Sequence, residues 1–146
     1  MTKTLQRLLR RKFKDSKDGA MNPRWKLVWI DLLLSKHFHQ ARKALRVLTL
    51  TPHGPQVSHC CLGVIAEALP RSVCRFAGRE GLRDLYFEGQ TAEVVLQTDS
   101  DSSEAILPEG VRQYIGLRED IQDHLTRLND AGATFTQIAH WIDKNL

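Results

Sequence analysis

The sequence has no long hydrophobic run and no leader-like segment. No window holds the roughly 18 consecutive apolar residues that a transmembrane helix needs. The basic N-terminus is not followed by a long apolar stretch or by a small-residue cleavage site, so it does not have the form of a secretory signal. We therefore expect a protein that does not associate with a membrane.

Cysteine is also scarce. The three cysteines, Cys60, Cys61 and Cys74, are odd in number, and two of them are adjacent, which argues against a disulfide framework. A reduced, cytoplasmic location is the expectation. No C-x-x-C or H-x-x-H spacing is present, so no metal site and no cofactor are predicted, although His59 and the cysteines are residue types that zinc accepts.

What the chain does contain is typical of one globular domain. It has 146 residues, of which 42% are hydrophobic and 26% charged. Its net charge of +4 is unevenly distributed. Residues 1–46 carry 13 Lys and Arg against 3 Asp and Glu, whereas residues 47–146 carry 8 against 14. The basic part attracts polyanions, or else the two parts attract each other within the chain or across a homodimer.

Two helices are predicted in the basic part. From Thr4, as N-cap, to Lys14, the apolar residues fall on one helical stripe: Leu5, Leu8, Leu9 and Phe13. Residues 15–19 read as a break, so residues 1–20 are predicted to be a basic amphipathic helix or arm and residues 21–146 a single globular domain. Asn22 and Pro23 are typical of a helix start. The helix that follows is apolar almost all round, and we expect it to be buried: Trp25, Leu27, Val28, Trp29, Ile30, Leu32, Leu33 and Leu34.

The middle of the chain has the pattern of strands around one short helix. Residues 46–51 and 56–60 are predicted to pair across the turn 52–55, and residues 84–88 and 92–97 are predicted to form two further strands. A short apolar helix over 61–69 contains Gly63, which indicates close packing against another element. Residues 98–104 are polar and predicted to be a mobile loop.

The last third has helical patterns again. Helices are predicted from Pro108 to Gly116, from about Glu119 to Asp130 with Gly132 as C-cap, and from a capping box that starts at Thr134. The predicted fold class is therefore α+β and helix-dominated, with a small antiparallel sheet packed by N-terminal and C-terminal helices.

Three further stretches form a distinctive pattern. They are residues 29–46, with an apolar helix followed by Ser-Lys-His-Phe-His-Gln and Ala-Leu-Arg; Cys-Cys-Leu-Gly-Val-Ile at 60–65; and 107–117, continuing into Leu-Asn-Asp-Ala-Gly-Ala-Thr-Phe at 128–135. Together they resemble a family of small proteins encoded by tailed bacteriophages and prophages. The sequence differs from the family pattern at Lys36 and Ala66. The resemblance implies a viral accessory protein that acts in a bacterial host cytoplasm.

A small-anion site is the first candidate for function. Polar residues before and within the first strand are predicted to lie beside the N-terminus of the helix that begins at Cys61, where a helix dipole and arginine suit phosphate or carboxylate. The predicted ligand-binding residues are Gln40, Arg42, Lys43, Arg46, His59, Cys60 and Cys61. With the resemblance, this predicts a non-enzymatic accessory protein that binds a host protein or a nucleotide-like anion to counter a host defence.

Two alternatives come from other classes. The basic N-terminal segment is typical of non-specific nucleic-acid binding through phosphates, with Arg7, Arg10, Arg11, Lys12 and Lys14 as the contacting residues. A cysteine-dependent enzyme is the other, with Cys61 as a nucleophile favoured by a helix N-terminus and His59 as its base, although no oxyanion hole or acidic partner is evident. No catalytic residue is therefore assigned.

Overall fold

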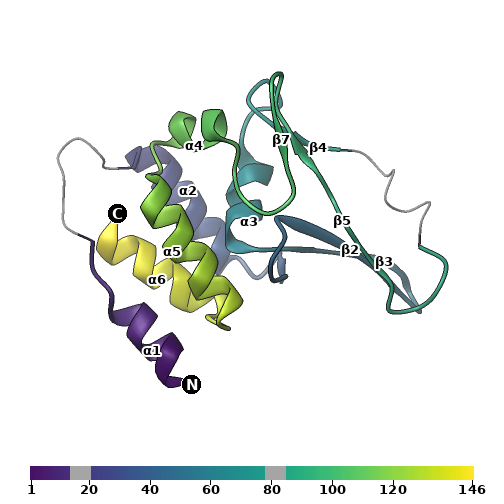
Figure 1. Cartoon of the computed structure of the whole chain (residues 1–146), viewed down its shortest axis with the longest axis horizontal. Helices are drawn as coiled ribbons and strands as arrows, with labels where there is room; N and C mark the ends of the chain where they lie inside the picture. Colours follow the sequence, from purple (N-terminus) through teal and green to yellow (C-terminus); the bar gives the residue numbers. More distant parts are fainter. Residues whose placement is uncertain (14–20, 78–84) are drawn as a thin grey trace.

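The computed structural model describes residues 1–13, 21–77 and 85–146. Within these residues the chain forms six helices and seven short strands. The helices gather on one side of the molecule, and the strands extend away from them on the other side (Figure 1). The predicted helix-dominated α+β fold is confirmed. No described helix has the length and apolar character that crossing a bilayer requires.

Helix α1 (Lys3–Arg10) carries the basic N-terminal charges. Its N-cap is Thr2, whose hydroxyl accepts the backbone N–H of Leu5 at 3.1 Å, so the predicted cap at Thr4 is wrong by two residues. The helix ends at Arg10, earlier than predicted, and Lys14 lies outside the described residues. Leu5 is buried, which places α1 against the body of the protein.

Helix α2 (Pro23–Leu34) begins as predicted, with the Asn22 side chain accepting the N–H of Arg24 at 2.9 Å. Trp29 and Leu33 are buried. The prediction that this helix is buried is wrong for its outer side, because Leu27 is 61% exposed and Leu34 is 41% exposed. Among the described residues, α2 packs mainly on α3 and α6, and its outer side is exposed.

The larger sheet is built around a hairpin. Strands β2 (Arg46–Thr51) and β3 (Gly54–His59) pair antiparallel across the predicted turn. Strand β5 (Thr91–Glu93) joins β2, and the two-residue strand β1 (His39–Gln40) joins β3 in parallel, giving the order β1-β3-β2-β5. The sheet is therefore mixed rather than wholly antiparallel, since the connection between β1 and β3 reverses twice.

A second, three-stranded sheet is formed by β4 (Arg75–Phe76), β6 (Leu96–Gln97) and β7 (Ser102–Ser103), all antiparallel. The strand predicted over 92–97 is thus divided between two sheets at residues 94–95, and β7 lies within the predicted loop 98–104. The strand predicted over 84–88 is wrong for residues 85–88. There the Gln90 side chain accepts the backbone N–H groups of Tyr86 and Phe87, which stabilises a turn; Asp84 lies outside the described residues.

Helix α3 (Cys61–Ala68) lies at the centre, between the helices and the sheets (Figure 1). Its residues 61–66 are all buried. A Cβ added at Gly63 would lie 1.8 Å from the carbonyl oxygen of Leu45, which confirms the predicted close packing.

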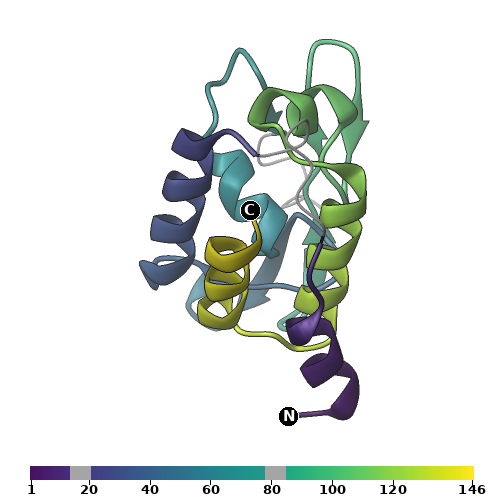
Figure 2. The same cartoon turned by 90° about the vertical axis from the view of Figure 1, so that its left-hand side faces the viewer.

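The C-terminal helices are α4 (Glu109–Ile115), α5 (Glu119–Asp130) and α6 (Phe135–Asn145). Gly116 ends α4 with φ of 75°, and Thr134 opens α6 with the predicted capping box. Ala131 is the C-cap of α5, one residue before the predicted Gly132. Figure 2 shows α6 between α2 and α5, with α3 behind it and α1 below α5.

Candidate functional site

The N-terminus of α3, where an anion was predicted to bind, is occupied by Asn129 of α5. The Asn129 side-chain oxygen accepts the backbone N–H of Cys61 at 3.1 Å and the Gln40 side-chain amide at 3.0 Å. The Asn129 amide nitrogen donates to the Ala41 carbonyl at 2.7 Å. Asn129 is 1% exposed. Its side-chain oxygen therefore occupies the position at the N-terminus of α3 where an anion would be favoured.

The loop that carries Arg42 and Lys43 is held against the end of α5. The backbone N–H of Lys43 donates to the Asp130 carboxylate at 2.9 Å, and Lys43 adopts a left-handed φ of 66°. The hollow left between Lys43, the cysteine pair and Asn129 has a volume of about 10 Å³. A cavity of that size holds about one water molecule, which is smaller than a phosphate group. The ligand-binding prediction for these residues therefore gains no support.

Arg46 and His59, the remaining predicted ligand residues, meet at Glu67 on α3. His59 Nε2 lies 2.8 Å from Glu67 Oε1, and Arg46 Nη1 lies 3.4 Å from the same oxygen. Burial raises the pKa of Glu67, but the hydrogen bond and charge of His59 and the charge of Arg46 outweigh burial and lower the pKa below its usual value. Both residues thus bind a carboxylate of their own chain and tie the hairpin to α3.

The buried thiols do not form a nucleophilic site. Burial raises the pKa of Cys60 to about 11 and raises the pKa of the fully buried Cys61 well above its usual value. The Cys61 thiol faces the Leu125 carbonyl at 3.7 Å, while His59 is engaged with Glu67. A nucleophilic cysteine needs a stabilised thiolate, so this geometry counts against the cysteine-enzyme alternative.

Metal ligands are likewise not gathered in the part of the chain that the structure describes. Over residues 1–13, 21–77 and 85–146, no group of three or more His, Cys, Asp and Glu side chains is placed to hold a metal ion.

The N-terminal segment is anchored to the body through its apolar side. The Phe13 ring lies edge-to-face against His124 and Trp141, with centroids 5.2 and 5.7 Å away. The Trp141 indole N–H donates to the Arg11 carbonyl at 3.0 Å. Leu5 is 5% exposed. Since the apolar side is packed on α5 and α6, the basic side of this segment faces solvent.

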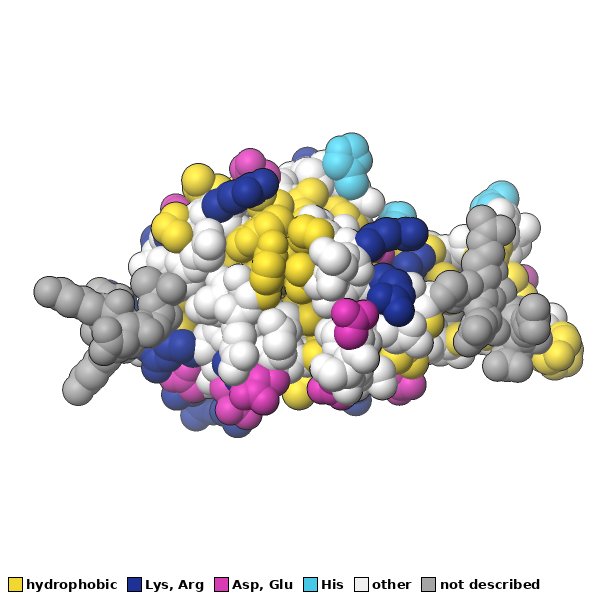
Figure 3. Space-filling model, turned by 90° about the horizontal axis from the view of Figure 1, so that it is seen from above, with side chains coloured by type: hydrophobic (Ala, Val, Ile, Leu, Met, Phe, Trp, Pro, Cys, Tyr) yellow, Lys and Arg dark blue, Asp and Glu magenta, His cyan; other side chains and the backbone are white. Residues whose placement is uncertain are grey.

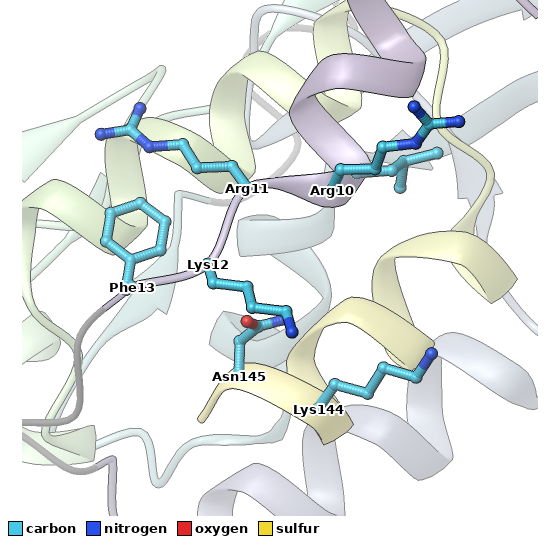
Figure 4. Close-up of a pocket in the computed structure, with 7 residues that line it drawn as sticks. Arg10, Arg11, Lys12, Phe13, Lys144 and Asn145 are labelled. Atoms are coloured by element: carbon cyan, nitrogen blue, oxygen red, sulfur yellow. The ribbon is translucent and has the colours of Figure 1, made fainter.

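Two hollows adjoin this segment. The first, of about 690 Å³, lies between the end of α1 and residues Lys144 and Asn145 of α6. The second, of about 760 Å³, lies between α1 and Arg127 of α5. Arg10 and Arg11 line both hollows, and Figure 4 shows their side chains extending to opposite sides while that of Lys12 extends toward Asn145. We call the basic residues that line the hollows the basic face: Lys3, Arg7, Arg10, Arg11, Lys12, Arg127 and Lys144.

The charges of the basic face are not neutralised by the described residues. All seven side chains are exposed, and no carboxylate oxygen in the described ranges lies within 4.0 Å of their cationic nitrogens. Residues 1–13 contain no Asp or Glu. The opposite face of the molecule differs, because basic and acidic side chains are interspersed there around a hydrophobic centre (Figure 3).

His124 lies beneath the basic face, and two arginines of that face affect its pKa. Its ring is 1% exposed, and its centroid is 4.7 Å from that of Trp141. The pKa of His124 is lowered to about 4, first by burial and then by the charges of Arg11 and Arg127, while a hydrogen bond to the backbone of Leu8 opposes the shift.

The structure thus brings together Arg7, Arg10, Arg11 and Lys12 of the predicted nucleic-acid-binding set, whereas Lys14 lies outside the described residues. Four residues of the two sites were not predicted from the sequence: Arg127, Lys144, His124 and Asn129. For Arg127 and Lys144 the only available signal was that they are basic residues in the acidic part of the chain. No sequence signal places them beside α1, since more than 100 residues separate them from it.

The chain matches no protein-family model, no curated protein and no solved structure. The resemblance to phage and prophage proteins, and the host-directed role that it implies, therefore stay predictions. The functional conclusion has to come from the geometry of the basic face.

Proposed function

We propose that this protein binds nucleic acid through the basic face. The observation that carries the proposal is the convergence of seven exposed cations, from the N-terminal segment, α5 and α6, on two adjoining hollows without a carboxylate partner among the described residues. A phosphate backbone satisfies several such cations at once and releases the counterions that both molecules had held. A small anion would engage only one or two of them.

An anionic membrane is a poorer match for the same charges. A basic amphipathic helix binds lipid by burying its apolar side in the bilayer. In this protein the apolar side of α1 is already used, because Leu5 is buried and Leu8 and Leu9 pack against the hydrophobic core. Only the charged side is free, and it suits a phosphate backbone.

Binding through the basic face should weaken as the salt concentration rises. Each phosphate contact on duplex DNA contributes about −0.9 to the slope of log K against log salt. If all seven cations make contact, the slope reaches about −6, and affinity falls steeply between low and physiological salt.

The test compares two double variants by fluorescence anisotropy with labelled DNA over a range of salt. Arg7→Gln with Arg10→Gln removes two charges from the basic face; Arg71→Gln with Arg75→Gln removes two exposed charges from the region after α3. We expect the first pair to reduce the salt slope by about 2 and the second to leave it unchanged. Equal losses for the two pairs, or wild-type binding that does not depend on salt, would contradict the proposal.

A further inference from the structure

Helix α1 has one cationic hollow beside it and a second at its C-terminal end. It projects from the lower end of the helical layer, beyond α5 and α6 (Figure 1, Figure 2). Arg127 faces it across one hollow, and Lys144 lies across the other, beyond the end of the helix. Positive charge is therefore presented by α1 together with two separate groups, Arg127 beside the helix and Lys144 beyond its end, rather than by a single row of side chains.

Helix α1 is of a size that the major groove of B-form DNA accommodates. The eight residues of α1 span about 12 Å at 1.5 Å per residue, and a helix with its side chains is about 10–12 Å wide. The major groove of B-form DNA is about 12 Å wide and is bordered by a phosphate row on each side. A single strand offers one row of phosphates, which would leave Arg127 or Lys144 without a partner.

The aromatic residues of this region do not suit a single strand either. Proteins that bind single strands stack bases on exposed aromatic faces. Here His124 and Trp141 are 1% and 3% exposed, and Phe13 is packed on both of them with the Arg11 guanidinium 4.7 Å above its ring. No described aromatic ring of the basic face is free to stack on a base.

We infer that the partner of the basic face is B-form duplex DNA, with α1 in the major groove and Arg127 and Lys144 on the flanking phosphates. The inference rests on the proposed function and specifies its ligand. Gln6, exposed on α1, is a side chain of the type that reads adenine edges. Duplex RNA does not fit, because the major groove of A-form RNA is too narrow and deep for a helix.

The first experiment measures binding of the full chain to three probes at equal phosphate concentration and equal salt. The probes are a DNA duplex of about two helical turns, one of its strands alone, and an RNA duplex of the same sequence. We expect the DNA duplex to bind at least about tenfold more tightly than either other probe, a difference of about 1.4 kcal/mol. Equal or tighter binding of the strand or of the RNA duplex would overturn the inference and leave nucleic-acid binding standing. Failure of all three probes to bind would overturn the proposed function itself.

The second experiment tests the groove and the flanks. Methylation of guanine N7 places a methyl group in the major groove, so a duplex with methylated guanines should bind at least about tenfold more weakly. Unchanged affinity for it would contradict the groove assignment. Arg127→Gln with Lys144→Gln should reduce the salt slope on the unmodified duplex by about 2, whereas Arg127→Lys with Lys144→Arg should retain it. A slope that the first pair leaves intact would show that the flanks are not in contact with phosphates.

Discussion

The indole N–H of Trp141 donates a hydrogen bond of 3.0 Å to the backbone carbonyl of Arg11. This bond joins the last helix to the end of the basic N-terminal segment, at the point where the two hollows meet. It fixes the backbone from which Arg10, Arg11 and Lys12 extend, so the shape of the basic face depends on a contact between the two ends of the chain.

Replacing Trp141 by Phe keeps a ring against Phe13 and His124 but removes that bond. We expect a loss of about 1 kcal/mol in the free energy of unfolding, measured by urea denaturation, and faster tryptic cleavage after Arg10 and Arg11. Trp25→Phe is the matched control, because the Trp25 indole N–H has no hydrogen-bond partner among the described residues. If both variants are cleaved at the wild-type rate, the bond does not hold the segment in place.

Asn129 connects α5, the loop after β1 and the start of α3, and its removal should be costly. In Asn129→Ala the buried N–H of Cys61 and the carbonyl of Ala41 lose their partners, and the Gln40 amide loses one of two. A buried polar group without a partner costs about 1–3 kcal/mol, so we expect a loss of about 3 kcal/mol in urea denaturation. Asn145→Ala, which removes a bond within α6 only, should cost no more than about 0.5 kcal/mol. Comparable losses of stability in the two variants would show that the hydrogen bonds of Asn129 contribute no more to stability than the bond of Asn145.

Replacement of glycine by alanine should have opposite effects on stability at Gly63 and at Gly110. In Gly63→Ala the new Cβ would lie 1.8 Å from the Leu45 carbonyl oxygen, so α3 must move, and we expect destabilisation of about 3 kcal/mol. In Gly110→Ala, on α4, the new Cβ meets nothing within 4 Å, and we expect stabilisation of up to about 1 kcal/mol from helix propensity. Thermal and urea unfolding of both variants check the signs. A stable Gly63→Ala protein would mean that α3 does not contact Leu45 as described.

Sequence patterns predicted local structure well where its physical cause is local. The start of α2 at Asn22 and the capping box at Thr134 depend on side chains that bond to backbone groups two or three residues away, and both are confirmed. The exposure of Leu27 was not predictable, because an apolar residue in an apolar helix carries no information about how many neighbours will cover it. Strand β1 was missed because two residues are too few to show a pattern.

In the candidate site, too, local features were predictable from the sequence and long-range contacts were not. The charge of the N-terminal segment was visible in the sequence, and so was the N-terminus of α3 at Cys61. The partners that decide their roles come from elsewhere in the chain. Asn129, which takes up the α3 N-terminus, is 68 residues from Cys61, and Arg127 and Lys144, which complete the basic face, are more than 100 residues from α1. Such pairings depend on tertiary packing, which periodicity and composition do not encode.

The ion pairs at Glu67 predict a pH dependence in acid. The folded-state pKa of Glu67 lies below its ordinary value of 4.5, so the unfolded chain takes up this proton first as pH falls. The stability that Glu67 contributes is complete above about pH 4.5 and is lost as pH falls through the folded-state pKa. In Glu67→Gln this contribution is absent, so the difference between wild type and variant in urea denaturation should shrink below pH 4.5. Glu88→Gln, in an exposed turn, is the control and should follow the wild type. A Glu67→Gln curve parallel to the wild type throughout would contradict the assignment.

His124 offers an internal probe of where a polyanion binds. Its pKa is lowered to about 4 by burial and by the charges of Arg11 and Arg127. Phosphates bound in the hollows would offset those two charges and leave the burial unchanged, so we expect duplex DNA to raise the pKa of His124 while keeping it below the ordinary 6.5. NMR titration of the histidine ring protons, downward from neutral pH, measures the shift in the free and bound protein. Binding that leaves His124 unmoved would place the phosphates somewhere other than the basic face, because no anion can sit beside Arg11 and Arg127 without changing the field that acts on this ring.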